Sequence, residues 1–379
     1  MFRTEIRPVR TRRDLKAFVG LGWDIYAGDP NWVPPLRSEL AALVTPGRHP
    51  FWDFSRRELF LAWQRDRPVG RIAAIIDGNH NRCHDERMGI WGFLECRHDP
   101  EAAAGLFRAA EKWLADQGMA FVRGPLNPSL NYEAGLLVQG FESPPALMMT
   151  YNPPYYGELV AMCGYRKEKD LVAYRVGREI AIPPWATGVA GRIAGRGDYT
   201  IVKLRRRRFP SQLRLLTHLY NEIWADNWGF VAMTDEEMQH TAKLLRHVMD
   251  TDLVFFVHHH GEPIGVCMLL PDINPLLRRL NGRLGPRALL TWWRYRSEIT
   301  GLRGLTFGVK AEYRQMGVPF FALDYLLRVL AGKPQYEWIE LGWDLEDNQA
   351  INLLYDEGGL RAGKRYRLFR KELPAGTRA

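Results

Sequence analysis

The residues from Glu312 to Phe321, EYRQMGVPFF, place a basic side chain and a glycine just before a helical pattern. The first turn of a helix carries unpaired backbone N–H groups and the positive end of the helix dipole, so it attracts anions. Arg314 adds a forked cationic donor, and Gly317 lets the backbone approach a ligand closely. This segment predicts a pyrophosphate-binding loop, although an R-x-x-G turn is a common feature.

Two histidine groups could supply metal ligands, His258–His260 and the pair His80 and His84. In the first group, strand alternation sends neighbouring side chains to opposite faces, so we do not expect the three imidazoles to meet at one ion. The second group lacks a matching distant pair of ligands. The four cysteines are dispersed without a C-x-x-C pair, which argues against a zinc ribbon. We therefore expect no metal.

The elements around the anion loop alternate between strand and helix patterns. In chain order they predict a β-hairpin, a strand, a helix, a strand, a helix and a strand, over residues 252–270, 301–310, 319–330, 336–346, 348–357 and 365–373. The loop then lies between a strand and the helix that follows it.

The first half of the chain shows a similar order. A β-hairpin, a strand, a helix and a strand are predicted over residues 58–76, 87–96, 100–118 and 120–125. No glycine precedes its helix, so we expect no phosphate loop there. The sequence predicts an α/β fold of mixed sheets in two tandem domains, residues 1–175 and 199–379, joined by a linker over 176–198.

A second motif follows the strand at 336–346, where Asn348 is followed by Tyr355 seven residues later and Gly359 eleven residues later. Together with the Arg314–Gly317 loop, this segment resembles the GCN5-related N-acetyltransferase (GNAT) superfamily over about residues 200–373. The resemblance implies that acyl-CoA is the co-substrate and that an amine accepts the acyl group. It also implies that Tyr355 protonates the leaving thiolate.

The resemblance assigns the remaining cofactor contacts by position. They are Val309, Arg314, Gln315, Met316, Gly317, Val318, Phe320 and Asn348. Two features depart from the family pattern. Pro319 stands where relatives carry glycine or alanine, which removes one N–H donor, and the strand over 302–309 lacks the glutamate that many relatives use as a base.

Three carboxylates could replace that base, namely Asp344, Glu346 and Asp226. Each of them also fits an ordinary surface or capping role.

Over its whole length the chain is similar to a bacterial group of tandem GNAT-like proteins, on segments such as DPNWVPPL, GPLNPSLNYEAGLL, YNPPYY and ADNWGFVAMT. This group includes bacterial ceramide synthases, so the resemblance implies transfer of a long acyl chain to a sphingoid base such as 3-oxosphinganine. Candidate contacts to this lipid-like amine are Asn127, Asn131, Glu133, Tyr151, Asn152, Asn227 and Trp228. The alternative is that polar residues of these loops only cap turns.

The formal net charge of +9 indicates an anionic partner. Residues 272–299 interleave leucine and tryptophan with arginine, which fits a helix at an anionic membrane surface or a helix packed on its own domain. Nucleic acid is not expected, because no recognition motif accompanies the charge. The charged N-terminus and the lack of a long apolar run indicate the cytoplasm, either free or peripheral on the inner membrane.

Two other functions stay open at this point. The chain could acetylate a small soluble amine, or it could bind CoA without catalysis, since Pro319 and the absent glutamate are features of a degenerate site.

Overall fold

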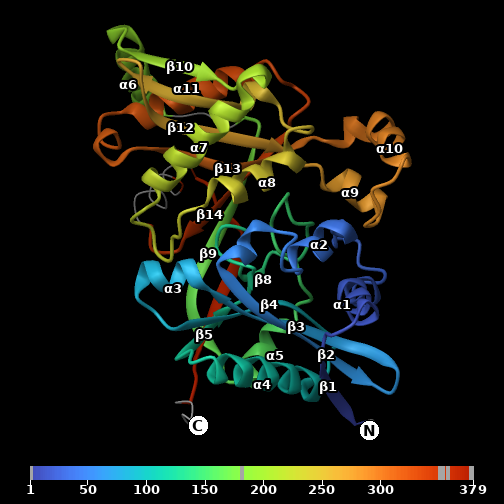
Figure 1. Ribbon diagram of the computed structural model, residues 1–379. Helices are drawn as coiled ribbons and strands as arrows, with labels where there is room; N and C mark the ends of the chain where they lie inside the picture. The colour runs from blue at the N-terminus through green and yellow to red at the C-terminus, as the bar shows by residue number, and fades with distance from the viewer. Residues whose placement is uncertain (1–2, 180–182, 349–354, 356–358, 375–379) are drawn as a thin grey trace. The chain divides into compact units, whose positions relative to one another are not determined.

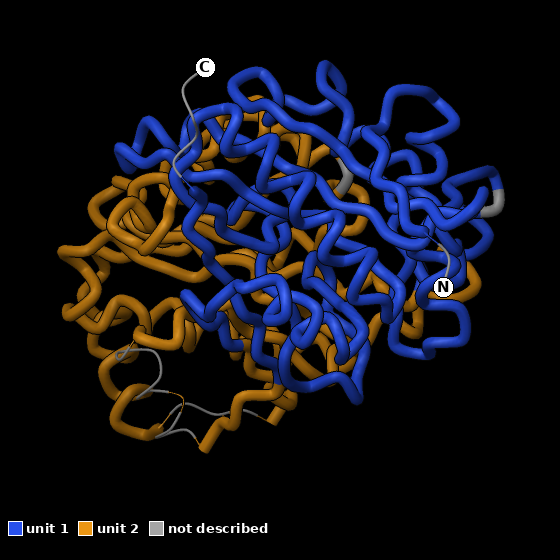
Figure 2. The backbone as a smooth tube through the Cα atoms, turned by 90° about the horizontal axis from the view of Figure 1, so that it is seen from below, with its two compact units in different colours: residues 1–172, 276–291, 364–379 blue, residues 173–275, 292–363 orange. Residues whose placement is uncertain are grey.

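The computed structural model describes residues 3–179, 183–348, 355 and 359–374. The chain divides into two compact units, and each unit combines segments that lie far apart in the sequence (Figure 2). Unit 1 consists of residues 1–172, 276–291 and 364–379. Unit 2 consists of residues 173–275 and 292–363.

Unit 1 is built on a mixed sheet (Figure 1). Its strands are β1 (Thr4–Pro8), β2 (Ser55–Gln64), β3 (Arg67–Asp77), β4 (Met88–Cys96), β5 (Phe121–Gly124), β8 (Leu136–Gln139), the first part of β9 (Arg166–Gly177) and β15 (Ala362–Glu372). Strands β1 to β4 are antiparallel, β4 and β5 are parallel, and β15 pairs antiparallel with β5 and β8. A separate ribbon joins β6 (Leu126–Asn127) to β7 (Glu133–Ala134).

Helices cover both faces of this sheet. They are α1 (Arg12–Ile25), α2 (Arg37–Leu43), α3 (Gly78–His84), α4 (Pro100–Asp116) and α5 (Tyr156–Met162), with a 3₁₀ turn η1 (Pro50–Asp53). Helix α4 starts where the Asp99 side chain accepts from the Ala102 N–H, and its buried Leu106 packs in one cluster with Ile72 of β3. The preceding residue of β3, Arg71, faces α1, because side chains alternate along a strand.

Unit 2 repeats the order of hairpin, strand, helix and parallel strand. Its strands are β10 (Tyr199–Lys203), β11 (Val254–His259), β12 (Glu262–Pro271), β13 (Gly301–Val309) and β14 (Trp338–Leu345). Strands β10 to β13 are antiparallel neighbours, and β13 pairs with β14 in parallel. The longer helices are α6 (Pro184–Arg196), α7 (Phe209–Ile223), α8 (Asp235–Leu245) and α11 (Val318–Ala331).

The remaining helices are short. Those of unit 2 are the 3₁₀ turns η2 (Arg206–Arg208), η3 (Thr251–Leu253), η4 (Arg296–Glu298) and η5 (Ala311–Tyr313). Helices α9 (Asn274–Leu280) and α10 (Arg287–Tyr295) are shared between the units, because residues 276–291 belong to unit 1.

The two faces of the unit 2 sheet carry different helices. Phe255 of β11 meets Tyr325 of α11 at a ring distance of 4.8 Å. Gly308 of β13 lies against Ile223 and Trp224 at the end of α7. Helix α6 packs beside α11 and occupies most of the segment 176–198 that the sequence suggested as a linker.

The predicted α/β class is confirmed, as are both hairpins, α4, α11, β14 and β15, each within a few residues of its expected bounds. The helix expected over 348–357 lies outside the described residues except at its flank and at Tyr355.

Strand β15 is held in unit 1 by a buried carboxylate. Asp170 of β9 accepts from Arg367 Nε at 2.8 Å and from Arg367 Nη2 at 3.0 Å, with Arg365 at 3.4 Å and Lys167 at 3.2 Å. Burial would raise the pKa of Asp170, but the hydrogen bonds and charges of Arg367 and Lys167 outweigh it and hold this pKa below its ordinary value.

We expect the Asp170→Asn variant to lose about 2–4 kcal/mol of unfolding free energy at pH 7, because it leaves partly buried cations without their counter-charge. Because the folded pKa is depressed, the difference from the parent chain should shrink as the pH falls below about 4. Urea denaturation measures both effects. Asp116→Asn, which breaks an exposed pair with Lys112, is the control and should change stability by less than about 0.5 kcal/mol.

Candidate active site

Strands β13 and β14 form a fork in unit 2. Their parallel pairing covers three residue pairs and ends at Arg303 and Glu340. Beyond that point β13 stays paired with β12 as far as Val309, while β14 continues to Leu345. The buried Arg303 guanidinium donates to the carbonyl oxygens of Gly304 and Glu340, so it supplies partners to backbone groups where the strands part.

A carboxylate and a phenol meet beside this fork. The Tyr355 hydroxyl lies beside the Asp344 carboxylate of β14, close enough for each group to shift the pKa of the other, and the Tyr355 ring centroid lies 4.4 Å from that of Tyr174. The second carboxylate oxygen of Asp344, Oδ2, is buried and has no hydrogen-bond partner among the residues that the structure describes. A buried acceptor without a partner is costly, and a substrate N–H would relieve it.

Burial pushes the pKa values of both groups upward. It raises the pKa of Asp344 to about 6, against the opposing effects of the neighbouring Tyr355 hydroxyl and of the Arg303 charge. It also raises the pKa of Tyr355, and the Asp344 charge adds to that effect. Near neutral pH the carboxylate is therefore mostly ionised and the phenol is protonated, which makes Asp344 a proton acceptor and Tyr355 a proton donor.

The predicted anion loop lies between β13 and α11. The backbone N–H groups of Gln315, Gly317 and Val318 have no acceptor within the described part of the chain, and Gly317 and Val318 are buried. N–H donors without partners at a helix start can form a cradle for an anion. Phe320, by contrast, donates its N–H to the carbonyl of Gly317 at 3.0 Å.

Two loop residues act differently from their predicted roles. Arg314 donates to the carbonyl of Ile223 at 2.7 Å and to that of Val309 at 3.4 Å, so it ties the loop to the end of α7. Gly317 has φ +81, and a Cβ there would collide with Val189 of α6. The glycine is thus required by backbone conformation and by helix packing, not by ligand approach alone.

Most of the predicted acceptor contacts in unit 1 bond to the chain itself. Asn127 accepts from the Phe93 N–H at 2.6 Å. Asn152 is buried and bonds both backbone groups of Leu137, at 2.7 and 3.1 Å. The Tyr151 hydroxyl donates to Asp29 at 2.9 Å. These contacts are those expected of residues that hold loops together.

Unit 1 also contains an acid–base group that sequence reasoning missed. Glu95 of β4 accepts from the Tyr156 hydroxyl at 2.8 Å and lies 3.5 Å from Arg71. Burial raises the pKa of Glu95 against the charge of Arg71 and the hydrogen bonds from Tyr156 and Tyr26. A single acid in the apolar strand MGIWGFLEC was the available signal, since alternation places it opposite the core residue Leu94.

Comparison with known proteins gives the family. No protein-family model matches the chain. Over 379 residues, however, it is 37% identical to the protein named bacterial ceramide synthase of Caulobacter vibrioides, covering 97% of each chain. The chain belongs to the bacterial ceramide synthase family. Another relative is protein YghO of Escherichia coli, 32% identical over 97% of this chain and 95% of that one.

Solved structures show the fold of this bacterial ceramide synthase family member. A tandem GNAT protein from the clavulanic acid biosynthesis pathway superposes with a TM-score of 0.55 at 12% identity, covering 98% of this chain and 99% of that one. The chain therefore has the fold of two tandem GNAT domains, as its sequence indicated.

Several other predicted site residues of this ceramide synthase family member lie in turns. Asp226 and Asn227 are exposed in the turn after α7, where the Asn227 N–H bonds Trp224 O at 2.9 Å. Asn348 donates its N–H to Leu345 O just beyond β14. Asn131 donates its backbone N–H to the Ser129 hydroxyl at 3.3 Å, and Glu133 accepts from the Asn127 amide at 3.4 Å. Among the other candidates, Val309 is buried, Met316 is exposed, and Trp228 and Glu346 are partly exposed.

We expect the Asp344→Asn variant to be more stable than the parent chain by about 2–3 kcal/mol at pH 8. An aspartate whose folded pKa is about 6 opposes folding when ionised, and the difference from its ordinary pKa corresponds to about 3 kcal/mol. Because the folded pKa is raised, the parent chain should gain stability as the pH falls from about 6 to about 4, so the advantage of the variant should vanish near pH 4.

Urea denaturation at both pH values provides the measurement. Asp226→Asn, at an exposed carboxylate, is the matched control and should leave stability unchanged at either pH. A loss of stability for Asp344→Asn at pH 8 would contradict the description of Asp344 as a carboxylate that burial disfavours.

Proposed function

We propose that the protein is an acyl-CoA-dependent N-acyltransferase that joins a long acyl chain to the amine of a sphingoid base. The Asp344–Tyr355 pair carries the proposal, because it places a proton acceptor next to a proton donor beside the fork of β13 and β14. The name of the relative from Caulobacter vibrioides supports the substrate class, since a ceramide is an N-acylated sphingoid base.

The reaction requires two proton transfers. The amine nitrogen attacks the thioester carbonyl, a C–N bond forms, and the nitrogen gives up one proton. Asp344 Oδ2 is suited to accept it, because this oxygen is buried without a partner in the described structure and its carboxyl has a pKa of about 6. The tetrahedral intermediate then collapses, the C–S bond breaks, and the CoA thiolate takes a proton from Tyr355.

The closeness of the two side chains closes the cycle. Protonated Asp344 returns its proton to the Tyr355 oxygen, which restores both groups, and the products are an amide and CoA with a free thiol. The net transfer runs from a carboxylic acid with a pKa of about 6 to a thiolate of ordinary basicity, which is downhill. Tyr355 thus acts as a relay, and its raised pKa prevents it from ionising alone.

The anion loop accounts for the CoA half of the substrate. Gln315, Gly317 and Val318 offer N–H donors at the start of α11, where the helix dipole adds positive potential. Pro319 removes one donor but fits the first turn of a helix, so the cradle keeps its other donors.

Incubation of purified protein with palmitoyl-CoA or acetyl-CoA and a panel of amines, read by mass spectrometry, tests the function. We expect an amide of palmitate with 3-oxosphinganine or a related base. Acetylation of small soluble amines without acylation of any sphingoid base would contradict the lipid assignment but retain the enzyme class. Binding of CoA without any product would contradict both.

The Tyr355→Phe variant should lower kcat by about 10²–10³-fold, because it removes the proton donor, while the dissociation constant for CoA stays within about twofold. Steady-state kinetics and calorimetry measure the two quantities. Tyr336→Phe is the control, since its hydroxyl bonds Asp250 instead. Unchanged turnover in Tyr355→Phe would remove this residue from the reaction.

The rate should also depend on the ionisation of Asp344. For the parent chain kcat should rise with pH through a midpoint near pH 6 and level off above about pH 7, because only the carboxylate accepts a proton. In Asp344→Asn this step in the profile should disappear together with most of the activity. A parent profile that is flat between pH 5 and pH 8 would exclude Asp344 as the base.

Helix α10 supports a membrane-associated substrate. Its Leu289, Leu290 and Trp293 are 81%, 63% and 67% exposed, and Leu284 before it is 62% exposed. The exposed arginines of this region are Arg278, Arg279, Arg283, Arg294 and Arg296. Exposed large apolar side chains among cations suit an anionic lipid surface, and no described helix has the length and apolarity to span a bilayer.

The double variant Leu289→Ser/Trp293→Ser should bind vesicles of phosphatidylglycerol and phosphatidylethanolamine about 10- to 100-fold more weakly than the parent chain, because it removes two apolar anchors. Vesicle cosedimentation measures this. Met162→Ser, at an exposed methionine of α5, is the control and should bind like the parent. Equal binding by all three proteins would contradict a membrane role for α10.

A further inference from the structure

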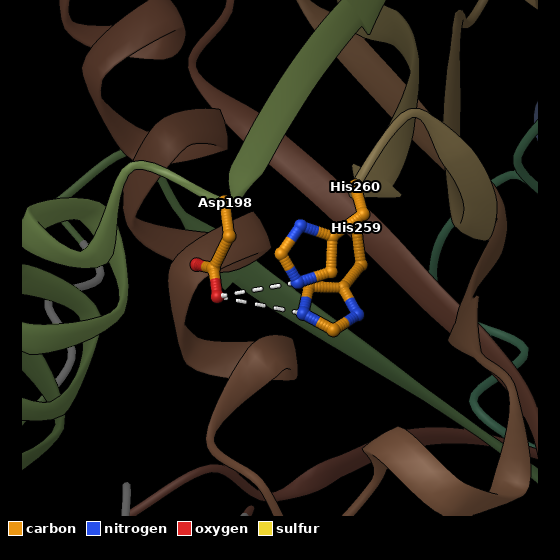
Figure 3. A group of neighbouring side chains, drawn as sticks. All are labelled: Asp198, His259 and His260. Carbon is orange, nitrogen blue, oxygen red and sulfur yellow. Dashed lines mark ion pairs between the residues drawn. The ribbon is translucent and has the colours of Figure 1, made fainter.

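Three side chains of types that can ligate a metal ion meet at the edge of the unit 2 sheet, outside the Asp344–Tyr355 pair. Figure 3 shows Asp198, at the start of β10, pointing at the imidazoles of His259 and His260, which end the β11 side of the hairpin. Their nearest ligand atoms all lie within 4.8 Å of one another. No sequence pattern links Asp198 to these histidines.

Backbone conformation explains why two neighbouring histidines share a site. The pairing of β11 with β12 is irregular between Val257 and His258, and His260 has φ +50 at the hairpin turn. Strict alternation therefore fails here, and the rings of His259 and His260 lie 4.3 Å apart. The backbone N–H of His260 also donates to the Asp198 carbonyl at 2.9 Å, which fixes the turn against β10.

The distances suit ligands of one ion better than direct hydrogen bonds. Asp198 Oδ2 lies 3.5 Å from His259 Nε2 and 4.0 Å from His260 Nε2, beyond the usual range for an N–H···O bond. Two ligands of one tetrahedral zinc ion, each about 2.0–2.1 Å from it, stand about 3.3 Å apart. The other Asp198 oxygen, Oδ1, is buried without a hydrogen-bond partner among the described residues.

The surroundings hold one histidine in a ligating orientation. His259 Nδ1 is hydrogen-bonded to the Tyr313 hydroxyl at 3.2 Å, which leaves Nε2 directed at Asp198. Tyr199 stacks on the same ring at 4.3 Å. A ligating histidine commonly bonds through its second nitrogen in this way, which fixes both tautomer and ring.

We propose that Asp198, His259 and His260 bind a divalent transition-metal ion of the zinc type. Two imidazoles and one carboxylate match the ligand preference of zinc and not that of magnesium or calcium, which take oxygen ligands. His260 is 71% exposed, so water completes the coordination. The ion also has a consequence for the anion loop, because Tyr313 belongs to the η5 turn that leads into it.

The first test uses the untagged full-length chain, stripped with a chelator and titrated with zinc against a chromophoric competitor. We expect one ion per chain, with at least 10-fold weaker affinity in His259→Gln and in Asp198→Asn. His258→Gln is the matched control, because His258 sits in the same hairpin but outside the cluster, and it should bind like the parent.

Absence of stoichiometric binding, or equal affinity in His259→Gln and His258→Gln, would overturn the proposal. A thermal scan guards against misfolding, since added zinc should raise the melting temperature of the parent and of His258→Gln but not that of His259→Gln. None of these readouts needs acyl transfer, so they stand apart from failure of the proposed function.

The link to the anion loop rests on the proposed CoA site and is measured separately. CoA affinity of the parent should change at least threefold between zinc and chelator, and that of His259→Gln should not change. Equal CoA affinity of the parent under both conditions would overturn the link, and the zinc titration alone would then decide the ion site.

Discussion

The fork between β13 and β14 is the constraint on which the candidate site depends. Parallel pairing stops after three residue pairs, and the buried Arg303 guanidinium donates hydrogen bonds to the backbone carbonyls where the strands separate. Everything proposed for the reaction follows from that separation: Asp344 lies on one branch, and the other branch leads into the anion loop. A fully paired sheet would have had no room for either group to meet a ligand.

Unit 1 contains a similar fork, but its own backbone fills the space between the strands. Strands β4 and β5 also pair in parallel over three residue pairs, ending at Ile90 and Arg123. There, however, Gly92 lies directly against the backbone of Leu126, and Asn127 takes the Phe93 N–H. The chain's own β6 thus fills the place that a ligand could take in unit 2. The same strand arrangement is thus filled by the chain in unit 1 and forms the candidate site in unit 2.

Sequence reasoning was strongest where the signal is local. The order of hairpin, strand, helix and strand and the position of the loop glycine are readable from periodicity and spacing, whereas the role predicted for Tyr355 came from the family resemblance. It was weakest where a residue's role depends on a distant partner. Arg314 donates to the carbonyl of Ile223, and Asp198 lies beside histidines about 60 residues further along the chain. Neither contact can be predicted from local periodicity.

The placement of β15 carries a consequence for biosynthesis. This strand lies between β5 and β9 in the sheet of unit 1, yet it is translated after all of unit 2. While the chain is still emerging from the ribosome, the first unit therefore has β5 and β9 facing an unfilled position, with the Asp170 carboxylate still lacking Arg367. The nascent protein must keep these exposed strand edges from pairing with other chains until the late strand arrives.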